Sequence, residues 1–266
     1  MGIIAVTGSA SGIGAATVAR LLNEGHRVIT VDRQATDIAC DLGTEQGRQQ
    51  AIQGIAELAG SQLDGLVTCA GIGGFPQRSG AEVAAVNYFG TTVLLAGLRP
   101  LLAAAGNASV VAISSNSATV QPGWPETLVA ACLSGNEAHA CTLANEVGPL
   151  LTYPASKAAV ARHVRRHAPT SEWIGAGIRL NAIAPGLVET ALVAEGRTDP
   201  DIARAFDAFP VPVGRAGRPE EVAALISFLL GQEAGFMCGS VIWLDGGSDA
   251  LLRPDDWPAV WNPPGM

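Results

Sequence analysis

Short apolar runs alternate with longer segments of helical periodicity along the whole chain. Unbroken apolar runs are typical of strands buried on both faces, and a helix between consecutive strands is the connection that parallel strands need. The runs that predict strands are 3–7, 27–32, 65–69, 109–114, 178–183 and 240–244, with a further short strand near 38–40. The pattern therefore predicts an α/β fold: a single-domain, Rossmann-like, doubly wound parallel sheet with helices on both faces.

Helical periodicity predicts helices at 13–24, 45–59, 83–105, 153–168, 199–206 and 219–230. Residues 121–150 interrupt the alternation and form an insert, which we expect to add helical structure beside the cleft. The last residues, 253–266, contain four prolines and two tryptophans, so we expect a docked tail without regular structure. The chain is thus predicted to be one domain at 1–252, including the insert, followed by a tail at 253–266.

Composition restricts the partners and the compartment. A net charge of −8 and a pI near 5.0 oppose binding to phosphate backbones, so neither nucleic acid nor a membrane surface is expected as a partner. The longest apolar run, 92–105, is broken by Arg99 and Pro100 and is shorter than the roughly 20 residues that span a bilayer. The N-terminus lacks the basic segment of a signal peptide, which predicts a cytoplasmic location.

The five cysteines and four histidines are scattered along the chain and have no metal-ligand spacing. We therefore expect no metal site, and we expect the cysteines to be reduced and mostly buried.

A glycine turn follows the first predicted strand and opens the first predicted helix. In this turn Gly8 permits the tight bend, Gly12 lets the backbone approach a pyrophosphate, and Gly14 allows the helix to pack closely on the strand. Ser11 and Ile13 lie between these glycines, where the first N–H groups of the helix can bind a phosphate. Glycine triplets also occur in ordinary loops, but the strand before and the helix after favour dinucleotide binding.

The second predicted strand ends in Asp32, at the position of an acid that hydrogen-bonds the adenosine ribose hydroxyls. A carboxylate there repels a 2′-phosphate, which favours NAD over NADP. Arg33 could soften that preference, and a solvated aspartate at a strand end would look the same in sequence. Asp41 and Leu42, after the possible third strand, are candidates for contact with the adenine.

Tyr153 and Lys157 stand four residues apart and therefore share one face of a helix. A neighbouring cation favours the phenolate, so the pair can serve as a general acid and base. Taken alone, such a pair is more often an exposed amphipathic pair. Its place after a dinucleotide half and before another strand favours catalysis.

Seven motifs occur in one order: TGSASGIG at 7–14, CAG at 69–71, Asn87 within VNYFGT, ISS at 113–115, YxxxK at 153–157, RLNAIAPG at 179–186 and DGG at 245–247. Together they resemble the short-chain dehydrogenase/reductase family over nearly all of the chain up to about residue 250. Within the family the flanking residues and the insert are most similar to the bacterial 3α-hydroxysteroid dehydrogenase/carbonyl reductase type.

The resemblance implies a role for each catalytic candidate. Tyr153 exchanges the proton of the alcohol, Lys157 lowers the pKa of that tyrosine and binds the nicotinamide ribose, and Ser115 holds the substrate oxygen. Ser114 and Ser117 are competitors for the serine role. Ser115 precedes Tyr153 by 38 positions (153 − 115) rather than the family's usual dozen or so. Asn87 matches the asparagine that supports a water link to the lysine; otherwise it is an ordinary polar residue in a helix.

Further positions carry over to the cofactor. Ala70 and Gly71 match the residues that pack under the adenosine, although Cys69 replaces a sheet-stabilising asparagine and is expected to be structural. Val188 and Thr190 match the residues that contact the carboxamide, after the Asn181, Pro185 and Gly186 segment.

The sequence therefore predicts a dinucleotide-binding catalytic domain that interconverts a secondary alcohol and a ketone with NAD. A hydroxysteroid or a similar flat, apolar alcohol is the first substrate to test, and the resemblance implies a homodimer or homotetramer. Two alternatives remain open: a non-catalytic dinucleotide-binding scaffold or redox sensor, and a 3-oxoacyl thioester reductase.

Overall fold

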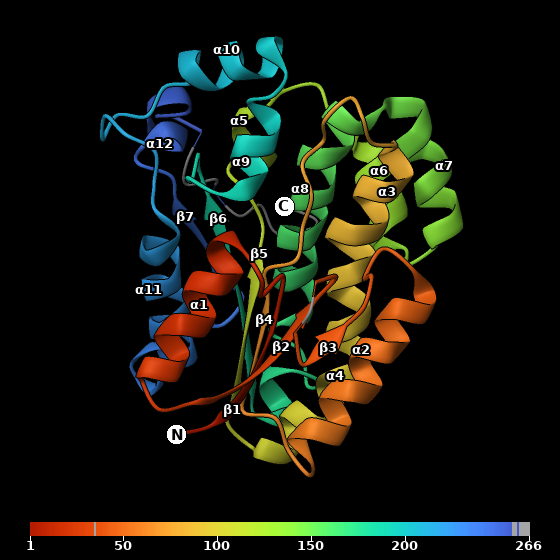
Figure 1. Cartoon of the computed structure of the whole chain (residues 1–266), viewed down its shortest axis with the longest axis vertical. Helices are drawn as coiled ribbons and strands as arrows, with labels where there is room; N and C mark the ends of the chain where they lie inside the picture. Colours follow the sequence, from red (N-terminus) through yellow and green to blue (C-terminus); the bar gives the residue numbers. More distant parts are fainter. Residues whose placement is uncertain (35, 257–259, 261–266) are drawn as a thin grey trace.

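Seven parallel strands form one sheet in the order β3-β2-β1-β4-β5-β6-β7 (Figure 1). This computed structural model describes residues 1–34, 36–256 and 260. The strands are β1 (Ile3–Thr7), β2 (Arg27–Asp32), β3 (Ile38–Ala39), β4 (Gly65–Thr68), β5 (Ala108–Ile113), β6 (Ile178–Pro185) and β7 (Val241–Leu244). The order reverses next to β1, which confirms the doubly wound fold and places a crevice at the carboxyl ends of the strands.

Helices cover both faces of this sheet (Figure 1). Successive residues of a strand point to opposite faces, so Leu66 of β4 packs in one core and Val67 in the other. The Leu66 core is closed by α2 (Glu45–Ala59), α4 (Gly90–Ala105) and α8 (Pro149–His167). The Val67 core is closed by α1 (Gly12–Asn23) and α11 (Pro219–Leu230). Strands buried on both faces explain why the sequence shows continuous apolar runs.

The predicted helix at 83–105 is three consecutive pieces. They are α3 (Gly80–Ala84), the π-helical turn η1 (Ala85–Phe89) and α4. Arg99 and Pro100 interrupt the apolar run but not the helix, because α4 continues through both to Ala105 as the predicted range has it. Among the described residues, Gly80–Ala105 is long and apolar enough to cross a membrane. Here it is a core helix, since Leu94, Leu95 and Leu98 are fully buried in the Leu66 core.

The helix that carries Tyr153 begins earlier than predicted. α8 starts at Pro149, after Gly148 with φ +84° as the N-cap, because proline suits the first turn of a helix. Pro154 lies inside the helix and has no N–H for the carbonyl of Leu150. The side chain of Gln121 donates to that carbonyl at 3.2 Å. The interruption expected from proline is thereby compensated.

The insert contains two helices, α6 (Glu126–Leu133) and α7 (Glu137–Val147). They pack against α8 and α3 and reach the core through Leu128, Val129 and Ala144. Arg48 of α2 pairs with Glu137 at 2.6 Å. The expectation of helical structure is met, although these helices cover the outer side of α8 and only the ends of the insert border the cleft.

The part of the chain that the structure describes has four further short helices: α5 (Ser117–Val120), α9 (Ala191–Gly196), α10 (Pro200–Ala208) and α12 (Ser248–Leu252). η2 (Ile174–Ala176) and η3 (Gln232–Ala234) are single 3₁₀ turns. The sequence pattern predicted only α10 among them. The expected docked tail lies mostly outside the described residues, of which 253–256 follow α12.

Candidate active site

A cavity of about 1020 Å³ lies at the carboxyl ends of the strands, where the order of the sheet reverses. It brings together residues that are far apart in sequence. All predicted cofactor residues line it: Gly8, Ser11, Gly12, Ile13, Gly14, Asp32, Asp41, Leu42, Ala70, Gly71, Tyr153, Lys157, Val188 and Thr190. Ser115 lines it as well, whereas Asn87 does not.

The glycine turn forms one end of the cavity. Gly8 has φ +65°, and a Cβ on it would lie 2.7 Å from the backbone nitrogen of Ala70. A Cβ on Gly14 would collide with the carbonyl oxygen of Gly8. Ser11 is the N-cap of α1, and its side chain forms no capping hydrogen bond. The start of α1 therefore presents N–H groups and an available hydroxyl to the cavity, as a phosphate site requires.

Asp32 stands at the end of β2 and is tied to the glycine turn. Its Oδ2 accepts from the backbone N–H of Ala10 at 3.0 Å, and its Oδ1 accepts from that of Gln34 at 3.2 Å. Arg33 next to it is exposed at the rim of the cavity. A carboxylate held in this way can accept hydrogen bonds from ribose hydroxyls.

The adenine candidates lie on the turn after β3. Asp41 is exposed and accepts from the backbone N–H of Gly43 at 2.8 Å, which stabilises the turn before α2. Leu42 is buried and presents an apolar surface to the cavity. Opposite, the Ala70 N–H donates to the Thr7 hydroxyl at 3.1 Å, so the wall that includes Gly71 is fixed to β1.

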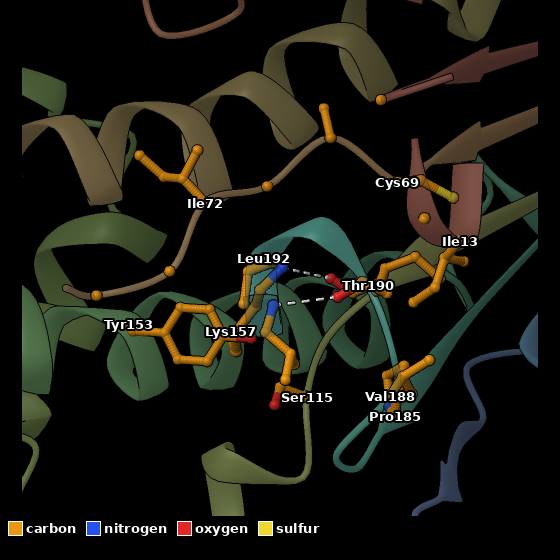
Figure 2. Close-up of a pocket in the computed structure, with 18 of the residues that line it drawn as sticks. Ile13, Cys69, Ile72, Ser115, Tyr153, Lys157, Pro185, Val188, Thr190 and Leu192 are labelled. Carbon is orange, nitrogen blue, oxygen red and sulfur yellow. Dashed lines mark hydrogen bonds between the residues drawn. The ribbon is translucent and has the colours of Figure 1, made fainter. Parts of the chain in front are cut away.

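The catalytic candidates gather at the other end of the cavity (Figure 2). Ser115 comes from the end of β5, and Tyr153 and Lys157 come from α8. Lys157 Nζ lies 5.9 Å from the centroid of the Tyr153 ring and donates to the carbonyl of Ile113 at 3.1 Å. Tyr153 is half-buried, since its ring faces the cavity, whereas Lys157 is buried.

Burial controls the titration of both groups on α8. It lowers the pKa of Lys157 to about 8. It raises the pKa of Tyr153, and a side-chain hydrogen bond with Ser115 opposes that rise. The sequence-based expectation that Lys157 lowers the tyrosine pKa differs from this result, because desolvation dominates here. Ser115 is the neighbour that favours the phenolate.

The structure separates the three serine candidates. Ser115 accepts from the N–H of Ser117 at 3.1 Å and contacts Tyr153. Ser114 donates its hydroxyl to the carbonyl of Lys157 at 2.8 Å. The hydroxyl of Ser117 is buried and forms no hydrogen bond among the described residues. Ser115 is therefore the serine whose hydroxyl lies beside the tyrosine and lowers its pKa against the effect of burial, despite the long separation in sequence.

Asn87 lies behind the wall of the cavity, on the π-helical turn. Its Oδ1 accepts from the N–H of Ile72 at 2.8 Å, and its Nδ2 donates to the Ile72 carbonyl at 3.0 Å and to the Ser156 hydroxyl at 3.3 Å. A Cβ on Gly71 would lie 3.3 Å from both Asn87 Oδ1 and Lys157 Nζ. Asn87 thus holds the cavity wall next to Lys157.

Cys69 also borders the cavity and is buried enough to raise its thiol pKa to about 12. The thiol therefore stays protonated near neutral pH, which favours a packing role over a reactive one. All five cysteines are free thiols.

The segment after β6 covers the cavity. Val188 is buried and pairs with Gly217 in an isolated parallel bridge, and Thr190 caps α9 by accepting from the N–H of Val193 at 3.4 Å. α9 and α10 follow and contribute apolar lining side chains: Leu192, Val193, Ile202, Ala205 and Phe206. Phe75, before α3, lines the same region. The sequence does not predict these residues as part of the site, because no motif marks them and their contacts join distant parts of the chain.

Two family models cover most of the chain. The model described as short chain dehydrogenase matches residues 2–129, and the model described as enoyl-(acyl carrier protein) reductase matches residues 147–249. The interval between the two matches, residues 130–146, lies inside the insert.

Individual proteins are similar over nearly their full lengths. A 3-alpha-hydroxysteroid dehydrogenase/carbonyl reductase from Comamonas testosteroni is 38% identical over 96% of this chain and 99% of its own. A cis-4-hydroxycyclohexanecarboxylate dehydrogenase from Sinomonas cyclohexanicum is 33% identical over 94% and 97%. The crystal structure of a 3-alpha-hydroxysteroid dehydrogenase from Pseudomonas sp. B-0831 complexed with NADH superposes with a TM-score of 0.91, at 44% identity over 95% of this chain and 99% of that one. These matches agree with the fold and with the motif order, and the chain belongs to the short-chain dehydrogenase/reductase family of oxidoreductase enzymes.

Proposed function

We propose that this enzyme interconverts a neutral, apolar secondary alcohol and its ketone with NAD, using Tyr153 as the general acid and base. The observation that carries the proposal is one cavity with two chemically different ends. Ser115, Tyr153 and Lys157 occupy one end, and the glycine turn and Asp32 occupy the other. A non-catalytic scaffold would have no use for the first group.

The residues at the glycine turn fit a dinucleotide. The start of α1 suits the pyrophosphate, and a side chain at Gly12 would contact Thr190 at 3.2 Å, so glycine keeps this passage open. The carboxylate of Asp32 favours NAD over NADP, because it can accept from ribose hydroxyls and repels a 2′-phosphate. The NADH complex of the Pseudomonas relative supports the same choice.

The mechanism follows from the positions of the protein groups. The chemistry that NAD would supply when bound is hydride transfer to and from the alcohol carbon, and the glycine turn and Asp32 would hold it. Tyr153 removes the hydroxyl proton during oxidation and donates it during reduction. Ser115 hydrogen-bonds the same oxygen and opposes the rise in the pKa of Tyr153, and Lys157 would hold the nicotinamide ribose. Asn87 keeps the wall next to Lys157 in place through Ile72.

The substrate end selects for apolar molecules. Its walls are Phe75, Phe206, Leu192 and Ile202, together with Val120 from α5. These side chains suit a flat alicyclic alcohol, and the names of the Comamonas, Pseudomonas and Sinomonas relatives are those of dehydrogenases for such alcohols. A hydroxysteroid is the substrate that we propose to test first.

The test is NADH formation by the purified protein with 3α-hydroxysteroids, cyclohexanols and linear secondary alcohols, in parallel with NADP. Tyr153→Phe is the matched variant because it removes one hydroxyl and keeps the ring. Turnover that requires NAD and falls at least about a hundredfold in the variant supports the proposal. Preferential reduction of a 3-oxoacyl thioester with NADPH would instead support the thioester-reductase alternative.

We also propose that the enzyme is a homodimer or homotetramer, as its family resemblance implies. α6 and α7 pack on α8, and Arg162 of α8 is paired with Glu126 of α6 at 2.5 Å. The insert therefore covers part of the face beside the tyrosine helix, and assembly would use other faces. Sedimentation equilibrium gives the mass, and a monomer at micromolar concentration would contradict this proposal.

A further inference from the structure

An ion pair joins opposite sides of the substrate end of the cavity. Arg78 lies in the segment between β4 and α3, and Glu195 lies on α9, 117 residues later (Figure 1). Arg78 Nη2 lies 2.6 Å from Glu195 Oε1, and Gln77 Nε2 donates to the same oxygen at 3.0 Å. We call Gln77, Arg78 and Glu195 the latch.

The latch is better ordered than an ordinary surface ion pair. The side chain of Arg78 is only 14% exposed, and its other terminal nitrogen lies 3.0 Å from Glu82 of α3. An arginine held between two carboxylates loses little further freedom when it binds either one. Partial burial also strengthens the attraction relative to fully exposed pairs.

Two phenylalanines pack on the same glycine directly beside the latch. Gly196, the residue after Glu195, is buried, and a Cβ on it would lie 2.7 Å from Phe75 and 2.8 Å from Phe206. Phe75 belongs to the Arg78 segment and Phe206 belongs to α10, and both line the cavity. The latch and this contact therefore join the same two parts of the chain.

α10 depends on such contacts for its position. None of its residues is buried, and Ile202, Ala205 and Phe206 line the cavity rather than the core. A helix with little core burial is held weakly by the rest of the fold. A charged hydrogen bond at its neighbour α9 can therefore determine where its apolar face lies.

We infer that Arg78 and Glu195 are positioning residues that select the substrate. By holding α9 against the Arg78 segment, they keep Phe75 and Phe206 as one fixed wall, against which a rigid, flat, apolar substrate is bound. A small alcohol that reaches Tyr153 without touching these rings gains nothing from the latch. This inference rests on the proposed function for its substrate and on the geometry alone for its effect on α9 and α10.

The test compares Glu195→Met and Arg78→Met with the double variant. The control is Arg204→Met, which breaks an exposed pair with Asp201 that lies within α10 and does not cross to the Arg78 segment. Steady-state kinetics are measured with a 3α-hydroxysteroid and with cyclohexanol. Amide hydrogen exchange of the full chain is followed at 191–209, and circular dichroism confirms folding.

Each latch variant is expected to raise the steroid KM about tenfold, the change that corresponds to one charge-assisted hydrogen bond, and to leave the cyclohexanol KM within about twofold. The kcat for both substrates changes little, and the double variant resembles each single variant. Exchange at 191–209 accelerates in the latch variants and not in Arg204→Met. Gly196→Ala displaces both rings without removing a charge. It is expected to raise the steroid KM relative to the cyclohexanol KM, as the latch variants do.

Equal effects in Arg204→Met, or an unchanged ratio of steroid to cyclohexanol KM in both latch variants, would overturn the inference. If the wild-type enzyme does not act on the steroid, the substrate proposal fails, and hydrogen exchange alone decides about the latch. Unchanged exchange at 191–209 in Glu195→Met then rejects it. If Glu195→Met does not fold, Glu195→Gln supplies the same comparison with a smaller perturbation.

Discussion

Ser114 and Ser115 are neighbours in sequence, but their hydroxyls have different partners. Ser114 donates to the backbone of α8 at Lys157, whereas Ser115 accepts from the N–H of Ser117 and lies beside the Tyr153 side chain. Both side chains are at least nine-tenths buried, and each loses one protein hydrogen bond when it is replaced by alanine. The two substitutions are therefore matched in size, in burial and in their expected effect on stability.

Their effects on catalysis should differ strongly. A donor that stabilises the charge developing on a reacting oxygen contributes about 10²–10³ in kcat. We expect Ser115→Ala to lose that factor. Ser114→Ala removes only a structural hydrogen bond, worth about 1 kcal/mol. Both variants should therefore unfold about 2–4 °C below the wild type, in the range expected for a domain of about this size.

The assay is kcat and KM for one secondary alcohol, together with thermal unfolding followed by circular dichroism. Ser117→Ala completes the comparison, because its hydroxyl is buried without a hydrogen bond among the described residues and should be dispensable for kcat. A decrease in Ser114→Ala or Ser117→Ala as large as that in Ser115→Ala would refute the assignment. A decrease below about tenfold in Ser115→Ala would refute a stabilising role for this hydroxyl.

Three further substitutions test the two ends of the cavity. Asp32→Ala should lower the ratio of kcat/KM with NAD to kcat/KM with NADP by about 10- to 100-fold, because a charged hydrogen-bond acceptor is lost. Asp41→Asn should leave this ratio nearly unchanged. Lys157→Met should lose activity while stability at pH 7 rises by up to about 3 kcal/mol, since burial lowers the pKa of this lysine to about 8 and penalises its charge. Above pH 8 the unfolded wild-type chain keeps the proton on Lys157 that the folded chain has lost, so wild-type stability rises with pH up to the pKa of this lysine in the unfolded chain. The stability difference between Lys157→Met and the wild type should therefore close over this range. A difference in urea midpoints that is constant with pH would contradict this. Asn87→Ala leaves buried polar groups of Ile72 without partners and should cost about 1–3 kcal/mol in urea unfolding, with a lower kcat; an unchanged midpoint would show that the wall does not depend on Asn87.

The sheet and the dinucleotide end could be predicted because their signals are local. Each strand is one short apolar run. The turn from Gly8 to Gly14 directly follows β1, makes the bend and includes the start of α1. Asp32 follows from its place at the end of a strand. Tertiary contacts were not needed to select these residues, and the structure places them all on the cavity.

Local signals were insufficient where packing decides the outcome. The π-helical turn at Asn87 has no glycine or proline to mark it, and α9 has only six residues, too few for a helical period to be recognised. The packing of Phe75 and Phe206 on Gly196 joins distant segments, so neither segment alone could predict it. The substrate wall is thus the part of the site that the sequence predicts least.

The insert shows why the long separation of Ser115 and Tyr153 does not disturb the site. Pro154 leaves the carbonyl of Leu150 without a helical donor, and Gln121 supplies one. Gln121 and Leu150 are the first and last residues of the predicted insert. Its two ends are therefore within hydrogen-bonding distance, and the segment between them leaves and rejoins the fold at one place. The entropic cost of closing a loop rises only slowly with its length, and the burial of Leu128 and Val129 against the core offsets that cost. A length difference between relatives can therefore be absorbed outside the cavity while Ser115 and Tyr153 stay in contact.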